Sequence, residues 1–198
     1  MTDPAPASAA VSAAAPAEGP VVAVAIYAGV SELELGAMVT VCRLCGGEGV
    51  TRTVNRSRAS IVTAGGLVMT PQVLYAALPE VCALLLPGGP GAARAARDPL
   101  LRAFLGVHAA LPTGASGSGL LLAGEGGLLR GREVGGPPEL EDSLWGYDPA
   151  SLHPGEVRRS GPLTSAPGGL GAVRAALAVA AQVWGEDVAA DAARRLGT

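Results

Sequence analysis

Two short turns hold the residues whose types and spacing best suit chemistry, and the first is rich in serine. Ala115-Ser-Gly-Ser-Gly119 precedes the apolar run Leu120 to Ala123, an order typical of a strand-to-helix turn that presents a nucleophile. The Gly-x-Ser-x-Gly pattern is missed narrowly by both Ser116 and Ser118, and the sequence places no histidine beside either hydroxyl. A serine-based nucleophile at this turn stays open as one alternative.

The second turn, Pro87-Gly-Gly-Pro-Gly91, follows an apolar run that ends at Leu86. A dinucleotide fingerprint would need Gly-x-Gly-x-x-Gly, but Arg94 stands where the third glycine belongs. Such a turn can instead point backbone N–H groups at a developing oxyanion. Nucleotide binding, an oxyanion site and a plain tight turn all remain open for this segment.

The cysteines and histidines give weaker signals. Cys42 and Cys45 form a C-x-x-C, but at the end of a predicted helix, whereas thiolates are stabilised at helix N-termini. We therefore expect two buried thiols that pack, not a redox or metal site. With Cys82 the chain has three cysteines, too few for a disulfide scaffold or a four-thiolate zinc site. His108, on a helix flank, and His153, in a Pro/Gly loop, are interpreted as ordinary residues.

Composition excludes several functions. All 14 basic residues are arginine, so a Walker A phosphate loop and Schiff-base chemistry on lysine are ruled out. A formal charge of −3 with scattered arginines argues against nucleic-acid binding. The longest apolar runs are about ten residues, too short to cross a bilayer, and Met1 to Gly19 lacks a secretory signal. We expect a cytoplasmic protein that binds neither membrane nor nucleic acid.

Strands and helices are expected to alternate along the chain. Continuous apolar runs predict strands buried on both faces, and Ser31 followed by two glutamates predicts the start of a helix that Gly46-Gly47 ends. The expected strands are 21–27, 50–54 and 81–86, with a hairpin over 60–70. The further expected helices are 73–77, 99–109, 120–129, 170–184 and 186–196.

This order predicts a doubly wound α/β sheet. In such sheets ligands bind at the carboxyl ends of the strands. Three segments should converge there: Ala28 to Glu34, Pro87 to Gly91, and Ala115 to Gly119. Residues 1–19, rich in alanine and proline, are expected to form a disordered tail in front of one domain over 20–198.

Five stretches, in order and spacing, resemble the ThiJ/PfpI superfamily, called DJ-1 in animals. The resemblance runs from Val21 to about Leu196 and implies a flavodoxin-like, class I glutamine-amidotransferase-like fold: a mostly parallel sheet with helices on both faces. It also implies a homodimer without a cofactor or metal. The stretches are Gly29–Glu34, Val68–Gln72, Leu84–Gly91, Gly119–Leu122 with Gly127–Arg132, and Leu163–Ser165 with the following helix and Gly185–Ala190.

The resemblance also assigns the superfamily's active site, which consists of a cysteine on the elbow, an acid after the first strand, a Gly-Gly oxyanion turn and often a histidine. The acid maps to Glu34 and the oxyanion turn to Gly88 and Gly89. The cysteine position maps to Gly117, and the histidine position falls in 135–138, which contains no histidine.

The strand before the elbow, 111–115, has also lost the β-branched residues typical of the superfamily, and its proline and glycine are expected to weaken it.

The missing nucleophile leads to the hypothesis of a pseudoenzyme. A glycine relieves the strained backbone of the elbow once no sulfur is needed, so Gly117 fits a non-catalytic small-ligand-binding or stress-related protein. In one alternative, a hydrolase, hydratase or glyoxalase-like enzyme attacks a small electrophile through Ser116 or Ser118 with Glu34. In another, a pocket between Glu34, Gly88 and Gly117 holds a small metabolite.

Overall fold

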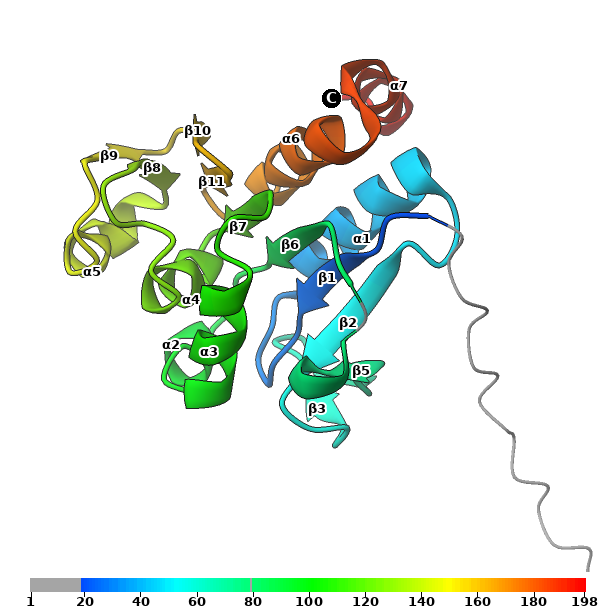
Figure 1. Cartoon of the computed structure of the whole chain (residues 1–198). Helices are drawn as coiled ribbons and strands as arrows, with labels where there is room; N and C mark the ends of the chain where they lie inside the picture. The colour runs from blue at the N-terminus through cyan, green and yellow to red at the C-terminus, as the bar shows by residue number, and fades with distance from the viewer. Residues whose placement is uncertain (1–18, 79) are drawn as a thin grey trace, which may run out of the picture.

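The computed structural model describes residues 19–78 and 80–198. Apart from Gly19, the predicted tail over 1–19 lies outside the described residues. A seven-stranded sheet in the order β10-β11-β7-β6-β1-β2-β5 forms the centre of the domain (Figure 1). All neighbouring pairs are parallel except β10 with β11. The doubly wound, mostly parallel, flavodoxin-like sheet is therefore confirmed.

The four central strands are short and fully buried, covered on both faces. β1 and β6 consist of Val, Ala and Leu, whereas β7 and β11 consist mostly of small residues that include buried Thr and Ser. The strands of this sheet are β1 (Val22–Ala25), β2 (Thr51–Asn55), β5 (Val73–Leu74), β6 (Ala83–Leu86), β7 (Thr113–Ser116), β10 (Arg158–Ser160) and β11 (Leu163–Ala166).

Helices cover both faces of the sheet (Figure 1). One layer consists of α1 (Glu32–Gly46), α6 (Gly171–Trp184) and α7 (Glu186–Leu196), which pack against one another. The opposite layer consists of α2 (Ala92–Ala95), α3 (Pro99–Val107), α4 (Gly119–Glu125) and the 3-10 turn η1 (Tyr75–Ala77). The smaller elements are the antiparallel pair β3 (Ile61–Val62) and β4 (Val68–Met69), the parallel pair β8 (Glu133–Gly136) and β9 (Ser151–Pro154), η2 (Pro138–Leu140) and α5 (Glu141–Trp145).

Several predicted elements form close to their expected bounds. Ser31 caps α1, accepting a hydrogen bond from the Glu34 N–H at 3.4 Å, and the helix ends at Gly46, followed by the capping residue Gly47, whose φ is +86°. The hairpin is present as β3 and β4, and α7 occupies the expected range.

Two of the predicted helices are wrong in detail. Residues 73–77 are not a helix, because Val73 and Leu74 pair with β2 before the 3-10 turn begins. The helix expected over 120–129 ends at Glu125. Strand β7 forms despite its glycine: a Cβ at Gly114 would lie 2.9 Å from Leu85 Cδ2. Glycine at this position lets neighbouring side chains approach the strand closely.

Candidate functional site

The candidate site lies at the carboxyl ends of β1, β6, β7 and β11, and its centre is Glu34. This residue is in the first turn of α1 and is only 6% exposed. Its Oε2 accepts a hydrogen bond from the Gly88 N–H at 2.8 Å, and its Oε1 accepts one from the Gly169 N–H at 3.1 Å. A buried carboxylate needs such partners, because a charge without them is costly to bury. Glu34, in the helix that follows β1, therefore binds the turns that follow β6 and β11.

Gly117 occupies the elbow, the turn of Gly117 and Ser118 between β7 and α4. Its φ is +54°, in the left-handed region that glycine adopts without a steric cost. A Cβ at Gly117 would lie 3.0 Å from Glu34 Oε1 and 3.1 Å from the Cα of Gly168. A side chain at this position would therefore point directly at the buried carboxylate, into space that its neighbours already fill.

The Gly88-Gly89 turn uses its backbone N–H groups within the protein. The Gly88 N–H donates to Glu34, and the Gly89 N–H donates to Ser118 Oγ at 2.8 Å. The Ser118 hydroxyl donates in turn to the Gly89 carbonyl, also at 2.8 Å. Both amides proposed as oxyanion donors thus have protein partners in this arrangement.

The two candidate serines are bonded to backbone rather than to a base. Ser116 is fully buried, and its hydroxyl donates to the Pro167 carbonyl at 3.4 Å. Ser118 is tied to Gly89, as described above. Within the described residues, neither hydroxyl forms a hydrogen bond with Glu34 or with a histidine. A general base must lie within hydrogen-bond reach of the proton that it takes, and Glu34 makes no such contact with either hydroxyl in the described residues.

The structure thus brings Glu34, Gly88, Gly89 and Gly117 together, and it adds Gly168 and Gly169, which sequence reasoning missed. The Gly169 contact joins residues 135 positions apart. The only signal for it in the sequence is Pro167-Gly-Gly169 shortly after Leu163–Ser165, one of the stretches that carry the resemblance. A strand-ending glycine pair of this kind marks a candidate contributor to the same sheet edge.

The cysteines lie away from this site. Cys42 follows Glu34 by eight residues on α1, or about 12 Å along a helix axis. Burial, with the neighbouring Cys45 and Cys82 thiols, raises the pKa of Cys42 to about 12, so its thiol stays protonated. Cys45 is only half-buried, which corrects the expectation of two buried thiols in the C-x-x-C. Cys82 is half-buried as well. Over the described ranges, no group of three or more His, Cys, Asp or Glu residues could hold a metal ion.

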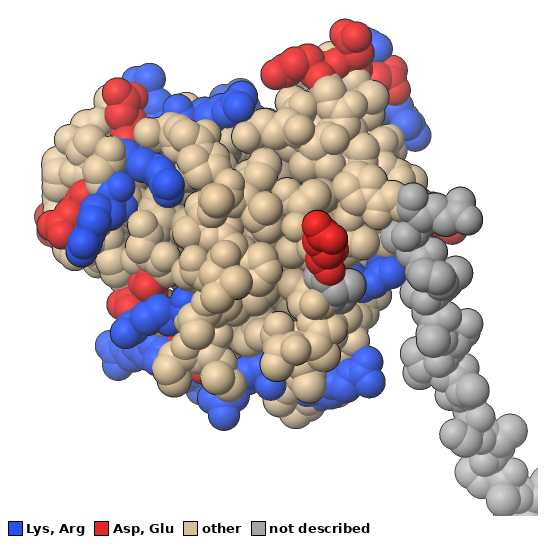
Figure 2. Space-filling model, in the orientation of Figure 1, with Lys and Arg blue, Asp and Glu red and all other residues tan. Residues whose placement is uncertain are grey.

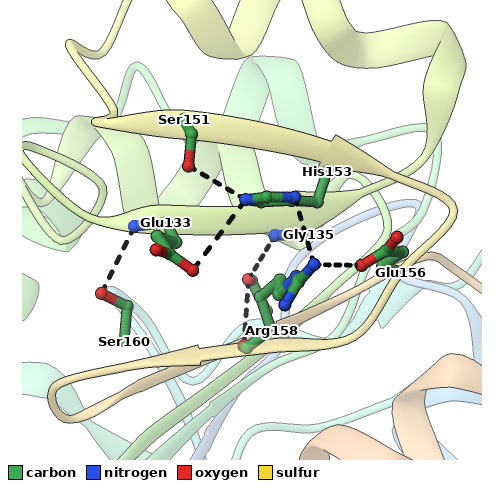
Figure 3. Close-up of polar contacts among 8 residues, drawn as sticks. Glu133, Gly135, Ser151, His153, Glu156, Arg158 and Ser160 are labelled. Carbon is green, nitrogen blue, oxygen red and sulfur yellow. Dashed lines mark hydrogen bonds and ion pairs between the residues drawn. The ribbon is translucent and has the colours of Figure 1, made fainter.

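A second polar cluster surrounds His153, which lies on strand β9 and not in a loop as expected. Ser151 Oγ is 2.9 Å from Nε2, Arg158 Nη2 is 3.3 Å from Nδ1, and Glu133 Oε2 is 3.9 Å from Nε2 (Figure 3). A guanidinium only donates, so the Arg158 contact is a hydrogen bond only where Nδ1 accepts. In a catalytic triad the acid faces the ring nitrogen opposite the one that faces the serine, whereas here Glu133 and Ser151 both lie at Nε2. The arrangement therefore differs from that of a catalytic triad.

His108, at the end of α3, places Nδ1 2.8 Å from the Phe104 carbonyl and its ring against that of Phe104. In the described parts of the chain, no helix is both long enough and apolar enough to cross a bilayer.

The fold of the chain is similar to that of several solved structures. A ThiJ/PfpI family protein from Pseudomonas syringae matches with a TM-score of 0.81 and 22% identity over 100% of this chain and 81% of its own. DJ-1beta from Drosophila melanogaster matches with a TM-score of 0.82 and 18% identity over 91% and 98%. A cysteine-to-alanine mutant of a DJ-1 superfamily protein from Salmonella typhimurium matches with a TM-score of 0.74 and 25% identity over 90% and 98%. No protein-family model and no curated protein sequence matches the chain.

Proposed function

The chain has the fold of the DJ-1 and ThiJ/PfpI superfamily, and from that premise we propose that its elbow no longer carries out thiol chemistry and that the protein binds a small molecule without transforming it. The observation that carries the proposal is the residue facing Glu34. Gly117 has no side chain, and a Cβ there would lie 3.0 Å from the carboxylate. Covalent catalysis needs a nucleophilic atom at that point.

The surroundings of Gly117 support the same conclusion. Stabilising an oxyanion requires N–H groups aimed at the developing charge. Here the Gly88 and Gly89 N–H groups are bonded to Glu34 and Ser118. An incoming substrate would have to displace Glu34 to receive the Gly88 hydrogen bond, and Ser118 to receive the Gly89 hydrogen bond. The turn therefore acts as part of the packed scaffold.

The ligand-binding half of the proposal draws on a cavity next to the same turn. It has a volume of about 500 Å³ and is lined in part by Gly91, the last residue of the Pro87–Gly91 turn. Cavities of roughly 300–1,000 Å³ are typical of small-molecule sites. The position also fits the fold, because doubly wound sheets bind ligands beyond the carboxyl ends of their strands.

The test is turnover of small electrophiles by the purified full chain, with methylglyoxal and an isonitrile as substrates and substrate loss followed by NMR. We expect the same rate for the protein, its Glu34→Gln variant and buffer alone. Turnover that disappears in Glu34→Gln would overturn the proposal. Turnover lost in Ser118→Ala but retained in Ser143→Ala, a variant at an exposed serine of α5, would show a serine-based enzyme instead.

We also propose that the protein forms a homodimer. Four apolar side chains are more than half exposed around the first turn of α1 and the β3–β4 hairpin: Leu33, Val62, Leu67 and Val68. Glu32 accepts a hydrogen bond from the Gly65 N–H at 2.6 Å, which holds the hairpin beside α1. Contiguous exposed apolar residues mark interaction surfaces, because leaving them in water is unfavourable.

A further inference from the structure

The cavity of about 500 Å³ has a lining that is rich in hydrogen-bond donors. It opens beyond the carboxyl ends of β1 and β2, between the β2–β3 connection and helices α2 and α3. Its polar lining includes Asn55, Arg56, Arg94, Arg97 and Asp98, and its apolar lining includes Ile61, Tyr75 and Leu101. The elbow and Glu34 are not part of this lining.

Asn55 is the buried polar residue of the cavity, with 9% of its surface exposed. Its Oδ1 accepts a hydrogen bond from the Arg56 N–H. Within residues 19–78 and 80–198, its Nδ2 donates no hydrogen bond to the protein and is not among the fully buried polar atoms. Asn55 lines the cavity, so this amide is an accessible donor for a ligand there.

Three arginines contribute positive charge, against a single carboxylate in the lining. That carboxylate, Asp98, is already engaged: it accepts from the Leu100 N–H at 3.0 Å and lies 3.6 Å from Arg56 Nη1. In the described part of the chain, Arg94 and Arg97 form no ion pair. An excess of positive charge at one cavity stands out in a chain whose formal charge is −3.

The surface view agrees with this local excess. In Figure 2 basic side chains gather along the lower edge of the molecule, where Figure 1 places α2, α3 and β3. Acidic side chains are sparse along that edge. Charge of one sign around a recess raises the local concentration of the opposite ion.

The apolar side of the cavity indicates that the ligand also has an apolar part. Ile61 and Leu101 are buried, and the Tyr75 ring stacks on Phe104 with centroids 4.9 Å apart and planes 19° from parallel. Burial, with Asp98 nearby, raises the pKa of Tyr75, so its hydroxyl remains a donor over the physiological range. A ligand with a compact ring or short apolar body would rest on this side.

We propose that this cavity binds a small organic anion, a phosphate monoester or a carboxylate with a compact apolar body, held by Arg56, Arg94, Arg97 and the amide of Asn55. Arginine matches such groups because its planar fork donates two parallel hydrogen bonds to their oxygens. The proposal rests on the ligand-binding half of the proposed function and is independent of the state of the elbow. An anion is better placed here than at the elbow, where the Glu34 carboxylate would repel it.

Isothermal titration calorimetry on the full chain at low salt tests the proposal, with phenyl phosphate, benzoate and phenol as probes. We expect phenyl phosphate, benzoate or both to bind, and phenol, which has the ring without the charge, to bind at least tenfold more weakly. A phenyl phosphate preference identifies a phosphate site, and a benzoate preference identifies a carboxylate site. Loss of charge-assisted hydrogen bonds in Arg94→Gln/Arg97→Gln should weaken binding roughly tenfold or more.

The matched control is Arg130→Gln/Arg194→Gln, which removes the same charge at two exposed ion pairs with Asp148 and Asp191. Its affinity should equal that of the unmodified chain. Equal weakening in both double variants, equal binding of phenol, or no binding of either anion at millimolar concentration would each overturn the proposal. The turnover assays and the binding assays test different proposals. If the protein turns over a substrate and still binds the anion, only the proposed loss of catalysis is overturned. If it neither binds the anion nor turns over a substrate, only the proposed anion site is overturned.

Discussion

At the scale of single residues, Gly117 is a position where the structure leaves little room for a side chain. Its positive φ and the 3.0 Å approach to Glu34 Oε1 are two separate penalties for any larger residue. A residue with a Cβ in such a conformation costs about 1–3 kcal/mol. Crowding against a buried carboxylate adds to that cost, because Glu34 is held by two backbone N–H groups and has little room to move.

Gly117→Ala should therefore lower the free energy of unfolding by roughly 1–3 kcal/mol or more, measured by urea denaturation. Gly127→Ala separates the two penalties, since Gly127 has φ +76° but nothing within 4 Å of an added Cβ. Gly106→Ala is the control without either penalty, because Gly106 lies inside α3 in open space. The order expected is Gly117→Ala least stable, then Gly127→Ala, then Gly106→Ala. A Gly117→Ala protein as stable as Gly106→Ala would contradict the geometry.

The sequence indicated much of the candidate site, but not how its polar groups are satisfied. Glu34 and Gly88 were accessible because each follows a recognisable buried strand, and Gly117 was accessible through the order and spacing of the motifs that carry the resemblance. The bond from Gly169 was not, because hydrogen bonds between residues 135 apart leave no local pattern. Asn55 was missed for a similar reason: nothing in the sequence tells that its Nδ2 lacks a protein partner.

At the scale of elements, Glu32 helps to hold the β3–β4 hairpin beside α1, together with backbone hydrogen bonds from the Gly29 N–H to the Val62 carbonyl and from the Ala64 N–H to the Val30 carbonyl. The Glu32 carboxylate accepts hydrogen bonds from the Thr63 hydroxyl and the Gly65 N–H. The hydrogen bond from Thr63, more than any other contact, lowers the pKa of Glu32. A carboxylate with a lowered folded-state pKa stabilises the fold above its unfolded-state pKa, and this stabilisation is lost as the pH falls through the folded-state value.

Glu32→Gln should therefore speed hydrogen exchange of the amides over 61–69 at neutral pH, measured by mass spectrometry. The difference in unfolding free energy between the two proteins should shrink as the pH falls below the range in which glutamate ionises, about 4.3 in model peptides. Glu48→Gln is the control, since that exposed carboxylate pairs only with Arg43, at 3.2 Å. Unchanged exchange in the hairpin, or a difference that grows on acidification, would show that Glu32 does not hold it.

Elements with long periodic patterns or clear end signals were predictable, and several short ones were not. α7 follows its amphipathic pattern over eleven residues, and α1 has both a capping serine and terminating glycines. β5 contains two residues, too few to show a period, and its strand character comes only from pairing with β2. The β8–β9 pair lies in segments rich in glycine and proline, where local propensity gives no strand signal.

At the scale of the whole molecule, the proposed dimer makes a prediction about mass in solution. Light scattering coupled to size exclusion should give twice the chain mass for the unmodified protein. Val68→Glu should give a monomer, because a charge cannot be buried unpaired in an apolar interface. Val107→Glu is the control at an even more exposed valine, 82% against 71%, at the end of α3. A monomeric unmodified chain, or equal dissociation in Val107→Glu, would contradict the proposed surface.

Glu34 has a consequence for how relatives of this fold are interpreted. Its two oxygens hold the turns after β6 and β11 against α1. The carboxylate therefore stabilises the fold independently of any reaction. Glutamine would put an NH₂ group against one of the two N–H donors, so even the isosteric replacement leaves a donor facing a donor. Selection for folding alone would then preserve this acid whether or not the site catalyses a reaction. An acidic residue after the first strand is therefore not, by itself, a sign of an active enzyme.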